Sequence, residues 1–209
     1  MHNHFSKNLN LRNLILERKP MVVVECGAGE GELTRQLSSM IDSSNFNLYV
    51  ISDKPVEGLD SRIIWKSGLS YNVLKEFEDD SIDFCIIDTD HNYWTLLKEL
   101  EVLVKKMREG GVIALHDVET FYHDTGMALS YFTGDKYPKD EIESCSPKGG
   151  LGDALIDFLH SDRLHWKLLS YNKESHGAAA IEKRTQTHFS LITPGPGAIY
   201  AKKTEELVA

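Results

Sequence analysis

The chain has 209 residues, 41% of them hydrophobic and 26% charged, which predicts one globular domain over residues 1–209. Its formal net charge of -9 excludes broad electrostatic attraction to a phosphate backbone, so we expect no nucleic-acid partner. The sequence also lacks the ~20 consecutive apolar residues of a membrane-spanning helix, the apolar centre of a secretory signal and any CxxC pair, which together predict a cytoplasmic protein without a membrane partner.

Strands and helices are expected to alternate along the first part of the chain. Residues 1–20 have leucines at helical spacing and end at Pro20. The following string "MVVVECGAGEG" begins with apolar, mostly β-branched residues, as is typical of a parallel strand that is buried on both faces. A helix is predicted over residues 32–41, and strands over 46–53 and 61–67.

The alternation continues with a helix over 71–79, a strand over 81–88, a long helix and a strand over 112–117. The long helix has an apolar stripe that includes Trp94 and Leu100, and Gly110-Gly111 is expected to end it. Strands that recur with helices between them imply right-handed crossovers. We therefore expect an α/β fold with a doubly wound, mostly parallel sheet.

The C-terminal part departs from this alternation. Residues 165–175 and 178–184 read as two strands joined by a tight turn at "HG", so an antiparallel hairpin is expected to finish the sheet. Residues 119–150 have no clear periodicity, and a long irregular segment in a compact domain is often a lid or binding loop. We predict that residues 119–150 form a substrate lid.

The loop after the first strand carries Gly27, Gly29 and Gly31. Ligands of an open α/β sheet bind beyond the carboxyl ends of its strands, and glycine lets the backbone come close to a ligand. A dinucleotide fingerprint, GxGxxG, would place its third glycine at Glu32, whose carboxylate would face the pyrophosphate of NAD. A nicotinamide-dependent enzyme is therefore an alternative rather than the leading hypothesis.

The string "ECGAGEG" resembles the first motif, E/DxGxGxG, of the class I S-adenosylmethionine-dependent methyltransferases. The resemblance implies a Rossmann-like methyltransferase sheet and S-adenosylmethionine as the cofactor. It places Glu25 near the methionine moiety and Asp53, which ends the second strand, at the ribose hydroxyls. A carboxylate accepts hydrogen bonds from vicinal hydroxyls, and acids suit a ligand that carries a sulfonium and an ammonium. The implied cofactor-binding residues are Glu25, Gly27, Ala28, Gly29, Gly31, Asp53, Ser70 and Asp88.

One position departs from the family pattern at the adenine. Methyltransferases of this class often have an acid after the third strand, and this chain has Leu69 there, followed by Ser70. The adenine contact is therefore the least defined part of the implied cofactor site.

The stretch "IIDTDHNYW" ends the fourth predicted strand. Together with "LHD" at the end of the fifth, it resembles the IDGDHxY and HD pattern of sugar-directed and other small-molecule O-methyltransferases, with acids placed as in the macrocin and catechol enzymes. The resemblance implies methylation of a hydroxyl on a sugar, a glycoconjugate or a small metabolite. Asp88 and Asp117 match the acids that bind Mg²⁺, a cation that prefers oxygen ligands. His91 matches the general base, a role that suits an imidazole.

Two residues near this point have open roles. His116 stands where the macrolide-sugar enzymes have an acid, so it could ligate a softer divalent cation, act as a second catalytic base or form a hydrogen bond within the site. Asp90 is well placed to cap the long helix. A noncatalytic S-adenosylmethionine-binding protein is the third hypothesis, and a homo-oligomer is left open.

Overall fold

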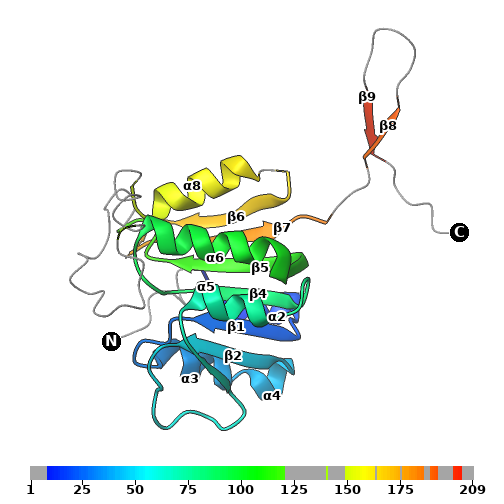
Figure 1. The fold of residues 1–209 in the computed structure, drawn as a ribbon. Coiled ribbons are helices and arrows are strands. Elements are labelled where there is room, and N and C mark those ends of the chain that lie inside the picture. Colours follow the sequence, from blue (N-terminus) through cyan, green and yellow to red (C-terminus); the bar gives the residue numbers. More distant parts are fainter. Residues whose placement is uncertain are drawn as a thin grey trace, which may run out of the picture.

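The structure is a computed structural model that describes residues 9–120, 140, 149–162, 164–174, 176–185, 189–192 and 200–203. Its main body is a seven-stranded sheet with helices on both faces (Figure 1). Most of the predicted lid, residues 119–150, lies outside the described residues, as does Cys145.

The main sheet has the strand order β3-β2-β1-β4-β5-β7-β6. Its strands are β1 (Val22–Cys26), β2 (Asn47–Ser52), β3 (Ile64–Ser67), β4 (Ile82–Ile87), β5 (Met107–His116), β6 (Trp166–Asn172) and β7 (Ala178–Lys183). The pairs among the first five are parallel, whereas β7 runs antiparallel to both β5 and β6. The predicted mostly parallel sheet and its C-terminal hairpin are both confirmed. A hairpin of β8 (Phe189–Ile192) and β9 (Tyr200–Lys203), which the sequence analysis does not anticipate, pairs separately.

Each face of the sheet is covered by its own helices (Figure 1). These are α2 (Leu11–Arg18), α3 (Glu32–Ser38) and α4 (Ile41–Ser44) on one side, and α5 (Ser70–Val73), the 3-10 turn η1 (Leu74–Glu76), α6 (Tyr93–Lys106) and α8 (Leu151–Ser161) on the other. Alternate residues of one strand enter different cores: Val24 packs with α6 and α8, and Val23 with α2 and α3. This explains why β1 reads as a continuous apolar run.

Asn92, not Asp90, caps the long helix α6. The Asn92 side-chain oxygen accepts a hydrogen bond from the backbone N–H of Thr95 at 2.8 Å, and Asn92 itself has an extended backbone. The prediction that Asp90 caps this helix is wrong, because the chain makes a further turn in which the Asn92 N–H donates to the Asp90 carbonyl at 2.8 Å. Asp90 is thereby left at the carboxyl edge of the sheet.

Gly110-Gly111 does not end α6. The helix stops at Lys106, and β5 begins at the next residue and runs through both glycines. The register between β4 and β5 shifts between Ile82 and Phe84, and Gly110 has a φ of 75°. The pair therefore accommodates an irregularity in a strand, where positive φ and the missing side chain are useful.

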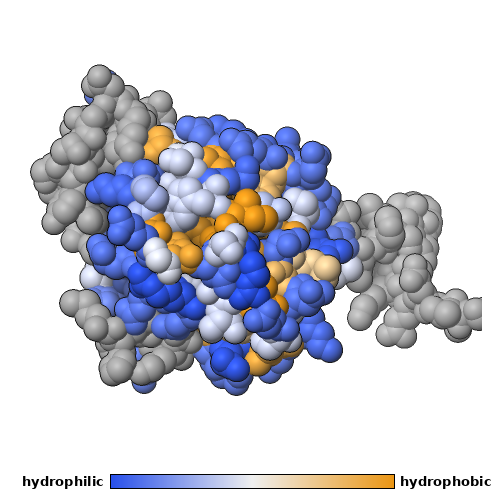
Figure 2. All heavy atoms as spheres, turned by 90° about the horizontal axis from the view of Figure 1, so that it is seen from below, coloured by the Kyte–Doolittle hydropathy of each residue, from blue (hydrophilic) through white to orange (hydrophobic). Residues whose placement is uncertain are grey.

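The face seen in Figure 2 is mainly hydrophilic, with apolar side chains in scattered patches. Among the residues that the structure describes, no helix has both the length and the apolar character needed to cross a membrane.

Candidate functional site

The strand order reverses between β1 and β4, so the loops that leave these two strands diverge and open a crevice at their carboxyl ends. Gly27 and Asp88 lie there in direct contact. A Cβ on Gly27 would be 1.9 Å from the Asp88 carbonyl oxygen, and Gly27 has a φ of +87°. Only glycine fits this position, because any side chain would force the two loops apart.

A cleft opens beside this contact. Its wall contains three of the predicted cofactor-binding residues, Gly27, Asp53 and Ser70, and also Leu69 from the position where the family has an acid. The other residues that line it are Ile51, Ser52, Gly68, Tyr71, Thr89 and Asp90. We call this the cofactor cleft.

The remaining residues of the glycine loop do not line the cofactor cleft. Ala28 is buried, and Gly31 begins α3 with a φ of 79°. A Cβ on Gly31 would lie 2.6 Å from a methyl carbon of Val56, whereas one on Gly29 would meet nothing within 4 Å. Gly31 thus permits close packing of the loop that follows Asp53, and Gly29 has no such steric requirement.

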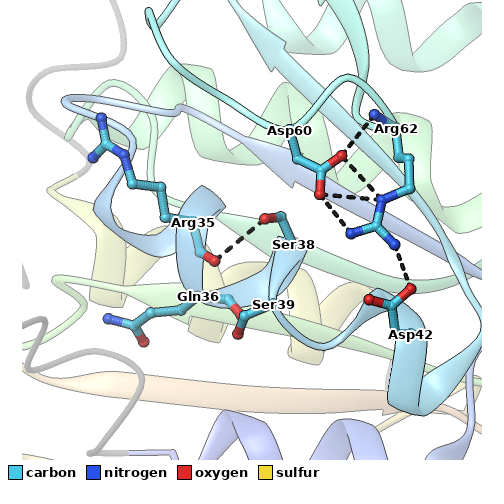
Figure 3. Close-up of polar contacts among 7 residues, drawn as sticks. All are labelled: Arg35, Gln36, Ser38, Ser39, Asp42, Asp60 and Arg62. Atoms are coloured by element: carbon cyan, nitrogen blue, oxygen red, sulfur yellow. Dashed lines mark hydrogen bonds and ion pairs between the residues drawn. The ribbon is translucent and has the colours of Figure 1, made fainter.

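The loop that follows Asp53 is held by Arg62 (Figure 3). The Arg62 guanidinium donates to Asp60 at 3.0 Å and to Asp42 of α4. Hydrogen bonds from Arg62 lower the pKa of Asp60 to about 2. The predicted ribose ligand, Asp53, therefore begins a loop that is tied back to α4.

Glu25 is fully buried, and neither carboxylate oxygen has a hydrogen-bond partner at ordinary distance among the described residues. Burial raises the pKa of Glu25 to about 8, the Thr34 hydroxyl on α3 lowers it, and the charge of Asp88 raises it further. Glu25 does not line the cofactor cleft. A buried acid of this kind stays neutral unless a positive group approaches it.

The polar residues at the ends of β4 and β5 meet in a second, narrower pocket. The Nε2 atom of His91 lies 3.1 Å from Asp117 Oδ2 and 3.6 Å from Asp88 Oδ1. The Nδ1 atom of His116 lies 3.2 Å from Asp88 Oδ1 and 3.3 Å from Asp117 Oδ1. The structure thus brings together both predicted metal-binding acids and both predicted catalytic histidines. We call this group the acid–histidine cluster.

The carboxylates and imidazoles of the cluster shift one another's protonation. Burial would raise the pKa of Asp88, but hydrogen bonds with His116 and His91 hold it well below its usual range. Burial would lower the pKa of His116, and Asp88 and Asp117 raise it above its usual value. Burial raises the pKa of Asp117 despite the neighbouring histidines. In the absence of another cation, a proton on His116 balances the charge of Asp88.

Asp117 also has a strained backbone. It is 7% exposed and has a φ of 58°, in the left-handed region that non-glycine residues rarely adopt. The following residues are held by the turn between β6 and β7, since the N–H groups of Glu119 and Thr120 both donate to the His176 carbonyl at 3.1 Å. Strain of this kind persists where surrounding contacts fix it, and it concentrates at functional sites.

A divalent cation fits the chemistry of this cluster. Asp88, His116 and Asp117 each offer a ligand atom, and these atoms lie within 4.8 Å of one another. Two carboxylate oxygens suit a hard cation, and the imidazole nitrogen extends the range to softer ones. His91 lies on the edge of this set, with its Nε2 atom toward both acids.

Sequence reasoning missed three residues at the site. The His176 ring lies 6.4 Å from the His116 ring, because antiparallel β7 returns the chain to the carboxyl end of β5. The predicted hairpin was the signal that could have placed it there. Thr89 lines both the cofactor cleft and the narrower pocket. Its hydroxyl is hydrogen-bonded to the buried carboxyl group of Glu99 on α6. No sequence motif indicated a role for Thr89 or Glu99.

The fold defines a Rossmann-like methyltransferase sheet, and comparison with known families agrees. The family model described as a methyltransferase domain matches residues 24–118. That segment contains every residue predicted to bind the cofactor or metal or to act in catalysis. A comparison with curated proteins finds no match.

Solved structures share the fold at low sequence identity. A Staphylococcus aureus protein provisionally named a caffeoyl-CoA O-methyltransferase has a TM-score of 0.58 and 13% identity, over 85% of this chain and 82% of that one. A Podospora anserina methyltransferase with bound S-adenosylhomocysteine has a TM-score of 0.58 and 16% identity, over 86% of this chain and 78% of that one.

A third neighbour was solved with bound Mg. The MycE methyltransferase of the mycinamycin pathway, in complex with Mg, S-adenosylhomocysteine and mycinamycin VI, has a TM-score of 0.59 and 19% identity. The match covers 88% of this chain and 50% of that one. The family match favours a methyltransferase domain over the nicotinamide alternative, and these neighbours share its fold.

Proposed function

We propose that this chain is an S-adenosylmethionine-dependent O-methyltransferase that uses a divalent cation to methylate a hydroxyl of a sugar, a glycoconjugate or a small metabolite. The observation that carries the proposal is the acid–histidine cluster next to the cofactor cleft. Asp88 contributes to both features, because its carbonyl contacts Gly27 and its carboxylate faces His116. A hydroxyl placed between them would have the cofactor on one side and polar groups on the other.

The cofactor cleft supports S-adenosylmethionine, which supplies an electrophilic methyl group when it is bound. Asp53 would accept hydrogen bonds from the ribose hydroxyls, and Gly27 leaves room for the methionine moiety to approach the backbone. Glu25 would become negatively charged when the positive groups of that moiety approach it, since its buried carboxyl group is otherwise neutral. Ser70 lines the cleft, and we assign it to the adenine.

In the proposed reaction, the His91 imidazole removes the proton of the acceptor hydroxyl. Asp117, whose carboxylate lies 3.1 Å from His91 Nε2, would stabilise the positive charge that develops on the ring. A cation held by Asp88, Asp117 and His116 would make a bound hydroxyl more acidic. The same residues would hold the hydroxyl in one orientation, which lowers the entropic part of the barrier.

We also propose that residues 1–209 form one domain and that residues 119–150 cover the acceptor. Support comes from where the described ends of this segment lie. Glu119 and Thr120 follow the acid–histidine cluster directly, and Leu151, just beyond the other end, lines the pocket that contains Asp88 and His91. A chain that leaves and re-enters at one pocket is well placed to close it.

The test is methyl transfer from radiolabelled S-adenosylmethionine to a panel of sugars, glycosides and phenols, with and without Mg²⁺, and with mass spectrometry of the product. Transfer to oxygen that depends on a divalent cation is expected. Transfer to nitrogen or carbon would overturn the proposed acceptor class. Tight binding of S-adenosylhomocysteine with no transfer to any compound would favour a noncatalytic binding protein.

A further inference from the structure

Glu99 is an acidic residue in the interior that no sequence motif marks. It lies on α6, is 0% exposed, and is surrounded by apolar residues of the core between α6 and the sheet. Burying a carboxyl group is unfavourable unless it is hydrogen-bonded, so its partners are informative. The exposed Glu101, two residues further along the same helix, forms an ordinary surface ion pair with Lys98 at 2.9 Å.

The partners of Glu99 come from two different loops at the carboxyl edge of the sheet. Ser70, after β3, donates a hydrogen bond to Glu99 Oε1, and the Thr89 hydroxyl, after β4, lies 2.9 Å from Oε1 and 3.1 Å from Oε2. Both partners line the cofactor cleft, and Thr89 also lines the pocket of the acid–histidine cluster. Glu99 itself lines neither cavity. It is therefore a buried link between the walls of the two cavities.

We propose that Glu99 is a positioning residue: its side chain, as a neutral carboxylic acid, holds the Ser70 and Thr89 hydroxyls so that the loops after β3 and β4 form one wall for the cofactor. This inference rests on the proposed function, because it concerns residues of the S-adenosylmethionine site.

The protonation state of Glu99 determines which hydrogen bonds the Ser70 and Thr89 hydroxyls can form. Each hydroxyl has one proton to donate. An ionised Glu99 would accept from both, and the two hydroxyls would offer only lone pairs to a ligand. A neutral Glu99 accepts from Ser70 through Oε1 and donates through Oε2 to Thr89, which frees the Thr89 proton for a group in the cleft. The carboxyl thus decides which hydrogen bonds Thr89 can offer.

The surroundings of Glu99 favour the neutral form. Burial raises the pKa of Glu99 to about 8, the hydrogen bonds with Ser70 and Thr89 lower it, and the charge of Asp90 raises it again. The other titratable groups near it are the buried thiol of Cys26 and, through Cys26, that of Cys85, and neither brings a positive charge. At neutral pH the hydrogen-bonded acid therefore carries its proton.

The experiment is calorimetric titration of S-adenosylhomocysteine into the wild type, Glu99→Gln and Glu99→Leu, with thermal unfolding of each and Glu101→Gln as a matched control. Glutamine reproduces a neutral acid, since its oxygen accepts from Ser70 and its amide donates to Thr89. We expect affinity within about threefold of wild type for Glu99→Gln and Glu101→Gln, and a loss of tenfold or more for Glu99→Leu. A merely structural role would change the unfolding temperature without changing affinity in the folded protein.

A further measurement keeps the test decisive. Wild-type affinity should change as the pH rises through 8, and in Glu99→Gln the part of this change that belongs to Glu99 should be absent, while the part due to Glu25 remains. If Glu99→Leu does not fold, the pH profiles of the wild type and Glu99→Gln test the positioning role instead.

Each outcome has one meaning. Wild-type affinity in folded Glu99→Leu, or identical pH profiles for the wild type and Glu99→Gln, overturns the positioning role. A tenfold loss in Glu99→Gln would show that the ionised form is the functional one and overturns the assignment of a neutral acid. A wild-type protein that binds no S-adenosylhomocysteine would instead refute the proposed function itself.

Discussion

His116 Nδ1 lies 3.2 Å from Asp88 Oδ1, although the two residues end different strands and are 28 positions apart in the sequence (116 minus 88). The parallel pairing of β4 with β5 sets this distance, because it aligns Ile87 with Leu115 and thereby brings the residues after them together. The contact makes His116 a candidate ligand for a cation held by Asp88.

His91→Ala should lower kcat by about 100-fold or more while S-adenosylhomocysteine affinity stays near the wild-type value, because a general base acts on the acceptor and not on the cofactor. Steady-state kinetics on an identified acceptor would measure this. His160→Ala, on the exposed side of α8, is the matched control and should retain activity. A wild-type rate in His91→Ala would remove the histidine from the mechanism.

Divalent cations should raise the unfolding temperature of the wild type, because they bind the native arrangement of Asp88, His116 and Asp117 and not the unfolded chain. Thermal shift with Mg²⁺, Mn²⁺ and Zn²⁺ would measure the effect and rank the cations. Asp117→Asn should abolish the shift, and Asp79→Asn, at an exposed ion pair with Lys106, should preserve it. Equal shifts in these two variants would place cation binding elsewhere.

Gly27→Ala should destabilise the fold by about 3 kcal/mol or more, since the new methyl group would overlap the Asp88 carbonyl in a backbone region that alanine avoids. Gly58→Ala is the control: its φ is also positive, at 69°, but its Cβ would meet nothing within 4 Å. We expect a cost of about 1 kcal/mol there, from backbone strain alone. Urea unfolding measures both. Equal losses would mean that the contact between the loops relaxes freely.

Stability should fall as the pH rises from about 5 to about 8, in part because of Glu25. Its folded pKa of about 8 lies above the ordinary value of 4.5, so in this window the folded chain binds more protons than the unfolded one. Each such group lowers the free energy of unfolding by at most about 1.4 kcal/mol per pH unit. Glu25→Gln should flatten this slope, as measured by urea unfolding at several pH values. An unchanged slope would mean that Glu25 is already ionised in the folded protein.

Local patterns anticipated most of the sheet because its strands carry their own signals. Apolar runs such as "VVVEC" and "DFCII" can be buried on both faces only inside a parallel sheet, and helical spacing marks the connections between them. Element ends were less predictable. The cap at Asn92 and the strand that passes through Gly110-Gly111 depend on the path that packing imposes on the chain, and single residues do not encode that path.

By itself the sequence determined which chemical groups stand at the ends of strands: Gly27 after β1, Asp53 after β2, Asp88 after β4 and Asp117 after β5. The carboxyl ends of parallel strands lie at one edge of a sheet, so the sequence also predicted that these residues lie near one another. Only the tertiary structure decided which atoms touch. It brought His116 within 3.2 Å of Asp88, and it buried Glu99 beneath Ser70 and Thr89. Such contacts join residues that are distant in the chain, so strand register and helix packing fix them.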